Sequence, residues 1–504
     1  MDIANAHAHN IKLCREYTGH DGSLTINADA ALAVIDRVSE VYGIDYNTLY
    51  DVTADHLLIR ANASNQGALA HGDTEGHTHA TVEFYARGTG APDWNTATWQ
   101  YMGVPFSDAN HAINLYQDGW MCRWIEDVTG NAGYNWKWIN NNDALTPFVG
   151  YGLTQADATT YTNTGTLVSS VDQTLTLTCA GTDYRGWNMF ANSWMAPIKI
   201  ADFQAADFGD AQATIYLFNT GINEGDQASC PESSSAGQYV AIPIASTSSM
   251  LADNQHIAPM QGFYIVTEAP TTVTLNYNRL VRNASGNEDD PLSVHSNRAP
   301  RRSAQDEAMR RIVIDVNGNR FSDRLYLFEN AEQTDTFDNA WDGLKFEGEA
   351  YAPQLMTRTS GLELAVDVSP SFDGKRIAFR AGEDTEYTLR FSTSETGLYL
   401  RDLTTDQEIE ITDGSTYAFF TYAKECEERF EIVDRRSATV TPTILDNTAV
   451  TKPTIIELTV YTIDGRLIEH RTTDFNLPLN LPQSGIYIVH LKTTAGMQVK
   501  KIKF

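Results

Sequence analysis

The sequence predicts an all-β fold of consecutive β-sandwich modules, immunoglobulin-like or jelly-roll-like, ending in a small antiparallel β module. Short segments rich in β-branched and aromatic residues alternate with polar positions, and turns of Gly, Pro, Asn and Asp separate them. Eight such segments follow at regular spacing in residues 309–434, which is typical of a sandwich. The length of 504 residues is enough for about two to four domains.

Residues 1–94 are predicted to be a β-rich segment at the truncated edge of an upstream domain. His56–Arg60 and Thr81–Arg87 have the alternation of strands. Ala30–Tyr42, which precedes Gly43, permits one short amphipathic helix, because Gly commonly ends a helix. We therefore expect one helix in an otherwise β-rich segment.

One cluster in this segment has the residue types of a metal site. The alternating residues would lie on one side of an extended strand, and they are His71, Asp73, Glu75, His77 and His79. Imidazole and carboxylate groups both bind divalent ions. However, glycines flank the cluster and no further ligand set is identifiable, which favours a polar hairpin tip. We predict no metal site and no cofactor.

Residues 95–284 are predicted to be a β-sandwich region with a diverged internal repeat, 95–180 and 181–284. Each half opens on a Trp-led strand and closes on a P-x-x-G-aromatic-x-aliphatic motif, at Trp99 and Pro147–Leu153, then at Trp187 and Pro259–Ile265. The distance from opening to closing is 48 residues in one half and 72 in the other. We expect the extra residues to lie in loops.

Four tryptophans of the first half fall close together: Trp120, Trp124, Trp136 and Trp138. A Trp ring can stack on the apolar CH face of a sugar, and Asn140 follows with an amide that can bind hydroxyls. Trp136, Trp138 and Asn140 are therefore the candidate glycan-binding residues. The alternative is that these rings belong to the core, where we expect Trp99 and Trp187 to lie.

Two linkers flank the sandwich predicted for residues 309–434. Residues 285–308 mix acidic residues, arginines and prolines, and residues 435–453 are rich in Thr and small residues. Within the sandwich, four residues resemble part of a calcium loop: Asp315, Asn317, Asn319 and Asp323. An EF-hand needs Gly at the sixth position, where this chain has Arg320. A polar hairpin is the favoured interpretation.

Composition and missing motifs exclude several classes of function. The net charge of −29 argues against a nucleic-acid partner, whose phosphates would be repelled. No run of 18 apolar residues occurs, so no transmembrane helix is expected. The five cysteines form no CxxC pair. No GxSxG, HExxH, P-loop or GxGxxG motif occurs, so no catalytic residue is assigned and the chain is expected to be no enzyme.

Residues 454–504 predict a compact antiparallel module. Ile456, Leu458 and Val460 alternate with polar or smaller residues, as in a half-buried strand. The pair Asp464-Gly465 marks one turn, and a turn at Gly485 precedes another β-rich run. A last strand closes the chain.

The module also resembles the C-terminal sorting domain of type IX secretion cargo from Bacteroidota. The residues that carry this resemblance are Asp464, Gly465, Arg466, Gly485, Tyr487, Lys500 and Lys501. The sandwich 309–434 resembles the domain that commonly precedes this module. The resemblance implies export by the type IX secretion machinery and attachment to the cell surface. Because that cargo needs a leader for export and the N-terminus has no apolar core, we expect an N-terminal part to be missing.

The predicted function is a non-catalytic region of a secreted, cell-surface-attached protein, which serves as a stalk, an adhesive or a binding surface. A host or matrix glycan or protein would be its partner. Two alternatives remain open. The chain could be the accessory C-terminal region of a secreted hydrolase, a protease or glycosidase, or it could be a carbohydrate-binding module.

Overall fold

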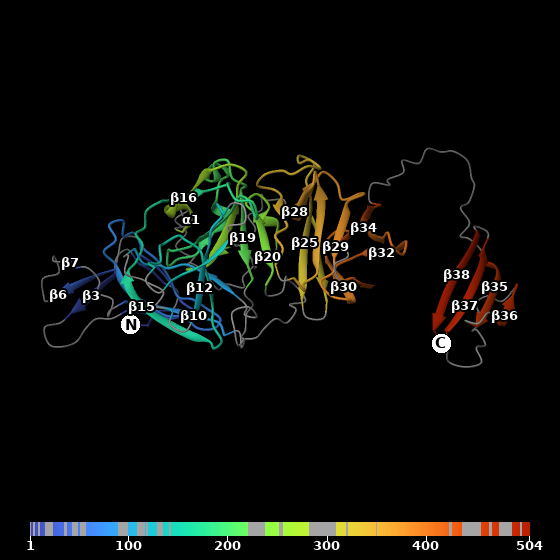
Figure 1. The fold of residues 1–504 in the computed structure, drawn as a ribbon, viewed down its shortest axis with the longest axis horizontal. Coiled ribbons are helices and arrows are strands. Elements are labelled where there is room, and N and C mark those ends of the chain that lie inside the picture. Colours follow the sequence, from blue (N-terminus) through green and yellow to red (C-terminus); the bar gives the residue numbers. More distant parts are fainter. Residues whose placement is uncertain are drawn as a thin grey trace. The chain divides into compact units, whose positions relative to one another are not determined.

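The computed structural model divides into two compact units, Met1–Ser437 and Ala438–Phe504 (Figure 1). Strands make up 54% of the structure and helices 5%, which confirms the all-β class. The structure describes residues 2–3, 6–8, 11–15, 24–34, 38–42, 49–50, 57–88, 99–107, 116, 119–128, 135–140, 143–219, 237–250, 256–281, 309–318, 321–348, 350–422, 426–435, 455–462, 466–472, 486–493 and 496–503.

The N-terminal part is a stack of parallel strands. The first column contains β1 (Asp2–Ile3), β4 (Leu24–Ile26), β8 (Leu57–Ile59) and β10 (His79–Ala86). The second contains β2 (Ala6–Ala8), β5 (Ala31–Val34) and β9 (Ala68–Ala70). The third contains β3 (Ile11–Arg15), β6 (Val38–Tyr42) and β7 (Leu49–Tyr50). Neighbours in a column pair in parallel, apart from β6 with β7. Successive turns of chain thereby bury an apolar interior that includes Leu24, Ile26, Leu57 and Ile59.

The helix predicted over Ala30–Tyr42 is wrong. The segment forms strands β5 and β6, and Leu32 and Val34 are buried. Parallel neighbours on both sides of β5 satisfy its backbone in the sheet. Tertiary pairing thus overrides a local pattern that fits either period.

Two four-stranded sheets follow along the chain. Sheet one contains β11 (Gln100–Met102), β12 (Trp120–Trp124), β13 (Trp136–Trp138) and β14 (Tyr151–Thr154), in the order β11-β14-β12-β13. Sheet two contains β17 (Trp187–Ala191), β19 (Thr214–Phe218), β20 (Tyr239–Pro243) and β22 (Gly262–Val266), in the order β17-β22-β19-β20. In both sheets the first strand therefore pairs with the last, and the third lies at the edge.

The two sheets contact each other reciprocally. Met102 bridges to Gln261, just before β22, and Phe190 bridges to Val149, just before β14. The amide of Gly103 donates to Met260 O at 2.8 Å, and the amide of Ala191 donates to Phe148 O at 3.3 Å. Each opening strand thus meets the closing motif of the other sheet, as in a two-fold arrangement.

The closing motifs share an uncommon backbone conformation. Phe148 and Met260 follow Pro147 and Pro259, and their φ angles are +61° and +59°. Side-chain-bearing residues rarely adopt this left-handed region. The two closing motifs therefore share a local geometry, which directs the chain into the closing strand of each sheet.

Shorter elements complete this part of the chain. They are β15 (Thr159–Thr166), β16 (Gln173–Leu177), β18 (Ile198–Lys199), β21 (His256–Ile257), β23 (Thr271–Leu275), η2 (Ile200–Asp202), η3 (Ala205–Phe208), η4 (Thr247–Ser249) and α1 (Tyr277–Leu280). Strand β15 pairs with β10, and β16 pairs with β23. Pairing with β15 joins the N-terminal stack to the residues that follow sheet one.

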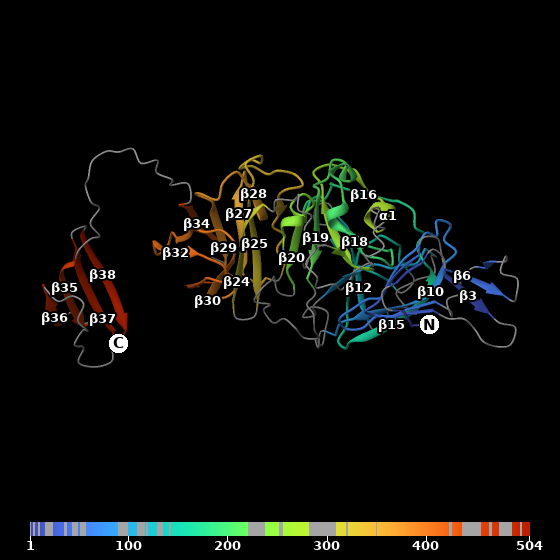
Figure 2. The same cartoon turned by 180° about the vertical axis from the view of Figure 1, so that it is seen from behind.

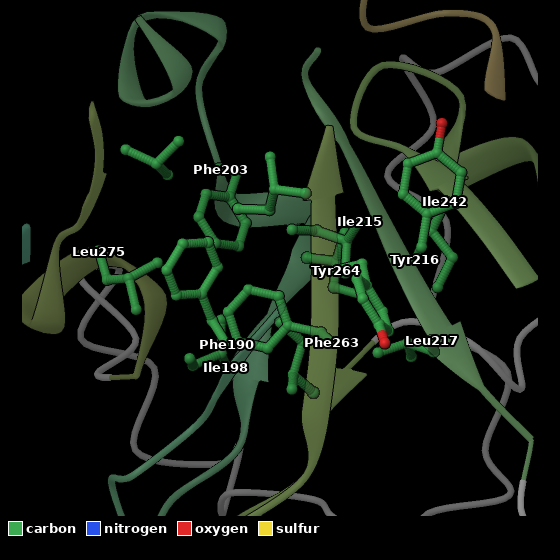
Figure 3. Packing of buried hydrophobic residues seen from close by; sticks show 14 of the residues in the cluster. Phe190, Ile198, Phe203, Ile215, Tyr216, Leu217, Ile242, Phe263, Tyr264 and Leu275 are labelled. Atoms are coloured by element: carbon green, nitrogen blue, oxygen red, sulfur yellow. The ribbon is translucent and has the colours of Figure 1, made fainter. Parts of the chain in front are cut away.

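A large core surrounds sheet two. Figure 3 shows Phe190, Phe203 and Phe263 on one side of β22 and the rings of Tyr216 and Tyr264 on the other. Both faces of this sheet are buried, which explains its nearly continuous apolar strands. The same core includes residues of the following sandwich: Val313, Tyr326, Phe328, Phe346, Ala365, Val366 and Val368.

That sandwich has two layers joined at β27 and β28 (Figure 2). One layer contains β24 (Arg310–Asn317), β25 (Ser322–Glu329), β26 (Gly343–Leu344), β28 (Leu362–Ser369), β30 (Thr385–Ser392) and β33 (Thr416–Thr421). The other contains β27 (Gln354–Thr359), β29 (Arg376–Arg380), β31 (Leu398–Asp402), β32 (Gln407–Ile411) and β34 (Cys426–Asp434). An interior of aliphatic and aromatic residues, such as Leu355, Phe372 and Phe430, lies between them.

Two of the residues that resemble a calcium loop, Asp315 and Asp323, belong to charged pairs. Asp315 accepts two hydrogen bonds from Arg324, at 2.6 and 2.9 Å, and both side chains are buried. Asp323 pairs with Lys345 at 2.5 Å, also in the interior. These carboxylates already have cationic partners, while Asn319 lies outside the described residues. The polar-hairpin interpretation is the one that these contacts support.

The second unit is a single antiparallel sheet in the order β36-β35-β37-β38. Its strands are β35 (Ile455–Thr462), β36 (Leu467–Arg471), β37 (Ile486–Thr493) and β38 (Gly496–Lys503). Leu458, Val460, Tyr487 and Val489 form its small apolar core. The alternation of Leu458 and Val460 predicted from sequence is therefore the buried side of β35.

Candidate binding surface

One face of sheet one is lined with aromatic rings. Cross-strand pairing places Trp124 opposite Trp136 and Cys122 opposite Trp138, and paired residues share a face. Trp120 lies two residues before Cys122, on the same face. Tyr101 joins them through its pairing with Gly152. The opposite face, with Met102, Met121 and Leu153, packs into the core next to the N-terminal strands.

Gly152 makes room for these rings on the sheet. A Cβ at this position would lie 3.1 Å from a ring carbon of Trp99 and 3.4 Å from one of Trp136. A side chain here would push both rings off the strand. Trp99 and Trp136 therefore lie directly over the backbone of β14.

Trp136 points into the protein rather than toward solvent. Its ring centroid is 5.4 Å from that of Tyr101 and 5.3 Å from that of Trp124. The Nε1 of Trp124 donates to Trp187 O at 2.6 Å, which fixes this cluster to sheet two. Stacking on a sugar needs an open ring face, but the half-buried ring of Trp136 already contacts the rings of Tyr101 and Trp124. The proposed pair of Trp136 and Trp138 is thus divided between interior and surface.

Trp138 is the exposed member of the pair, with 49% of its surface accessible. Its ring lies 5.9 Å from that of Trp99, tilted by 50°. Asn140 is exposed nearby, but its Nδ2 and its amide both donate to the carboxylate of Asp143, at 3.3 and 2.9 Å. The Asn140 side chain therefore stabilises the turn after β13. We name Trp99, Trp120 and Trp138 the outer tryptophans.

Next to Trp136 lies a group of three tyrosines, of which Tyr264 is buried and Tyr101 and Tyr239 are half-buried. The hydroxyls of Tyr101 and Tyr239 are 2.8 Å apart, and Tyr264 contacts both rings. Burial raises the pKa of all three phenols above the ordinary value of 10. The three phenols therefore remain neutral at physiological pH.

A buried carboxylate that sequence reasoning missed orders the loop beside this surface. Glu126 accepts hydrogen bonds from the Thr178 hydroxyl and from the amides of Ala180, Gly181 and Gly186. Burial alone would raise the pKa of Glu126, but these donors lower it below its usual value. The loop that it holds presents Tyr184, 57% exposed, against Trp124.

The cluster around His71 is a turn and not a strand. Asp73 accepts hydrogen bonds from the amides of Glu75, Gly76 and His77 and from the Thr78 hydroxyl. Burial would raise the pKa of Asp73, yet these donors lower it. Among the described residues, no group of three or more His, Cys, Asp or Glu side chains is arranged to hold a metal ion. The alternation expected along residues 71–79 is therefore broken by the turn.

The proposed sorting residues lie in the second unit. Tyr487 is buried in its core, and Arg466 is exposed, with its amide donating to the Thr462 hydroxyl. Lys500 and Lys501 belong to β38. Asp464, Gly465 and Gly485 lie outside the described residues. Of this set, Tyr487 in β37 and Lys500 and Lys501 in β38 belong to strands of one sheet.

Comparison with known proteins finds one curated relative. The chain is 29% identical over 375 residues to the minor fimbrium subunit Mfa5 of Porphyromonas gingivalis, strain ATCC 33277. The match covers 70% of this chain and 30% of the relative, so the chain spans about 30% of the length of the protein it matches. No protein-family model matches, and no solved structure matches.

This similarity supports a surface protein from Bacteroidota, with a structural rather than an enzymatic character. It also supports a secreted, cell-surface location. In the part of the chain that the structure describes, no helix has the length and apolarity needed to span a membrane.

Proposed function

We propose that this chain is a non-catalytic region of a secreted, surface-attached protein, in which it serves as a rigid stalk that carries a binding surface. The similarity to a fimbrium subunit over 70% of the chain carries this proposal. The alternative, an accessory region of a secreted hydrolase, lacks a comparable observation. We also propose the domain boundaries expected from the sequence, including the two repeat halves 95–180 and 181–284.

The packing between sheet two and the following sandwich supports the stalk role. The hydroxyl of Tyr216 accepts a hydrogen bond from the amide of Leu344 at 3.0 Å, and Ser246 Oγ donates to Trp341 O at 2.7 Å. Arg311 donates to Ser249 O at 2.8 Å. Together with the shared apolar core, these contacts make a continuous interface that opposes bending between the two parts.

We assign residues 454–504 the role of the export signal for type IX secretion. The test is expression of the full chain behind a native leader in a Bacteroidota host, beside a version lacking residues 454–504. Surface immunofluorescence and protease shaving should detect the full chain outside the cell, whereas the truncated chain should remain in the periplasm. A matched control replaces exposed Lys492 by Ala, which leaves the proposed sorting residues intact. Surface display of the truncated chain would refute this role.

The adhesive role needs a separate measurement. Beads coated with the full chain should adhere to bacterial or host surfaces, whereas beads coated with an unrelated acidic β protein should not. Adhesion that persists after glycan removal and disappears after protease treatment would assign a protein target. Absence of adhesion to any tested surface would leave the stalk as the function and contradict the binding role.

A further inference from the structure

Sheet one and sheet two can be superimposed residue by residue from their pairing. Tyr101 pairs with Gly152 as Met189 pairs with Tyr264, and Cys122 pairs with Gly152 as Tyr216 pairs with Tyr264. At the edge, Cys122 pairs with Trp138 as Tyr216 pairs with Ala241. The outer tryptophans Trp99, Trp120 and Trp138 therefore correspond to Trp187, Thr214 and Ala241.

In sheet two these three positions are covered by one segment of the sandwich, Asp342–Phe346. The Thr214 hydroxyl donates to Asp342 O at 3.2 Å. A Cβ on Gly343 would lie 2.7 Å from the Cβ of Ala241, and the Phe346 ring lies 3.9 Å from that of Trp187. Trp187, Thr214 and Ala241 are consequently 9%, 0% and 3% exposed.

The edge strand of sheet two has the same cover. Strand β20 contacts β26 and β28 of the sandwich, and Figure 1 shows β20 beside β28. The covering part is thus a β-sandwich that presents a segment with one aromatic ring, and this segment includes the short strand β26. Its backbone supplies a carbonyl acceptor, and its glycine allows close approach.

In sheet one the three corresponding residues are more exposed, and Trp120 and Trp138 are larger than Thr214 and Ala241. Trp99 and Trp120 are half-buried, and Trp138 is 49% exposed. Large aromatic residues gathered on an accessible face are typical of interfaces, because burial of a Trp ring contributes a large apolar area. Among the described residues, the Asn140 side chain already donates to Asp143, so the amide proposed from sequence to bind a sugar hydroxyl is engaged in the turn.

We propose that the outer tryptophans form the docking site for a β-sandwich of another protein subunit, which places an aromatic-bearing segment there as Asp342–Phe346 lies on sheet two. The internal correspondence argues for this occupant, since the same chain shows how this type of sheet is covered. The inference goes beyond the proposed stalk role and does not depend on how the chain is exported.

The test uses the full chain labelled with 5-fluorotryptophan, which gives one ¹⁹F resonance for each of the nine tryptophans. The probe is a synthetic peptide with the sequence of residues 338–348, DNAWDGLKFEG. Substitutions Trp138→Phe and Trp99→Phe assign the two signals and keep a ring at each site. Peptide binding should shift the signals of Trp138 and Trp99 with saturation in the high micromolar to millimolar range.

Variants make the result specific. Trp138→Ala should weaken peptide binding about tenfold, and Trp138→Phe should restore most of it. A peptide with Ala in place of its Phe should bind at least about fivefold more weakly. The control Tyr422→Ala removes an equally exposed ring, 58% accessible, from the sandwich and should change nothing.

Four outcomes would overturn the proposal. The peptide could leave all signals unmoved at millimolar concentration, or it could bind equally well to the Trp138→Ala chain. It could shift the Trp187 signal alone, which would mean competition with the existing cover of sheet two. Finally, Trp138 could respond to oligosaccharides and not to the peptide, which would assign the face to a glycan.

Discussion

Sheet one and sheet two have the same strand order and the same register, but their aromatic faces are used differently. In sheet two the sandwich covers the face, and the residues there include small ones such as Thr214 and Ala241. In sheet one the corresponding residues are tryptophans, of which Trp138 is half exposed. Strand pairing thus fixes the framework, whereas the residues on each face depend on what lies over it.

The difference also shows why one pattern in a sequence can mean two things. A Trp-led strand and a closing P-x-x-G motif occur in both halves, and in both they build the same joint at Phe148 and Met260. The motif therefore predicts local geometry. It does not predict whether the ring beside it is core or surface, because the covering segment lies about 160 residues further along the chain for Trp187.

The largest effect is expected from removing the cover of sheet two. Phe346→Ala should lower the free energy of unfolding by about 3–5 kcal/mol, because it leaves a cavity against Trp187 and Tyr239. Trp138→Ala should cost less than about 1 kcal/mol, since that ring is half exposed already. Urea unfolding followed by far-UV circular dichroism measures both. Equal costs would mean that the two faces are equally buried and would end the comparison.

A smaller loss of stability should follow from removing the Glu126 carboxylate, which joins the end of β12 to the loop before β17. Glu126→Ala should cost about 3 kcal/mol, because it leaves buried amides of Ala180, Gly181 and Gly186 without their acceptor. Glu126→Gln should cost less, since its amide oxygen still accepts. The neighbouring exposed acid offers a control, and Asp127→Ala should be nearly neutral. A neutral Glu126→Ala chain in thermal unfolding would show that the loop does not depend on this carboxylate.

Gly150 and Gly262, the glycines of the two closing motifs, test whether the contacts between the two sheets are equivalent. A Cβ on Gly150 would lie 2.5 Å from Met189 Cγ and 2.8 Å from Phe190 O, and one on Gly262 would lie 2.8 Å from Tyr101 Cβ. Gly150→Ala and Gly262→Ala should each cost about 2 kcal/mol through this crowding. Calorimetric melting of the two variants measures the pair. A cost at one site alone would show that the contacts are alike in geometry but not in tightness.

The smallest effect concerns pH and the covering segment. Burial raises the pKa of Asp342 to about 7, although the amides of Asp338 and Val368 oppose the shift. A raised carboxyl pKa stabilises the fold at low pH, and this contribution is lost as pH rises from about 4 through 7. Relative to the parent chain, Asp342→Asn should therefore gain stability between pH 5 and pH 8, by on the order of 1–2 kcal/mol. If the free energy of unfolding changed with pH in the same way in both chains, the raised pKa of Asp342 would be contradicted.

Much of the fold follows from sequence because strands carry their own period. Thr81–Arg87 alternates and forms β10, and the buried residues Leu458 and Val460 alternate in β35. The segment at Ala30–Tyr42 failed because parallel pairing with distant turns of chain decides its state. Its local pattern holds no trace of those partners.

The candidate site was only partly predictable for a similar reason. Register alone places Trp136 and Trp138 on one face, as alternation suggests, but the rings of Tyr101 and Trp124 draw Trp136 inward. Glu126 gave no signal at all, because its four donors come from residues 52 to 60 positions later. Spacing within a segment cannot report such contacts.

The interface between sheet two and the sandwich has a mechanical consequence. Tension applied between sheet two and the sandwich would pass through every contact that joins them. Those contacts include a wide apolar layer and the hydrogen bonds at Tyr216 and Ser246. Separating sheet two from the sandwich would therefore require both the apolar layer and these hydrogen bonds to break.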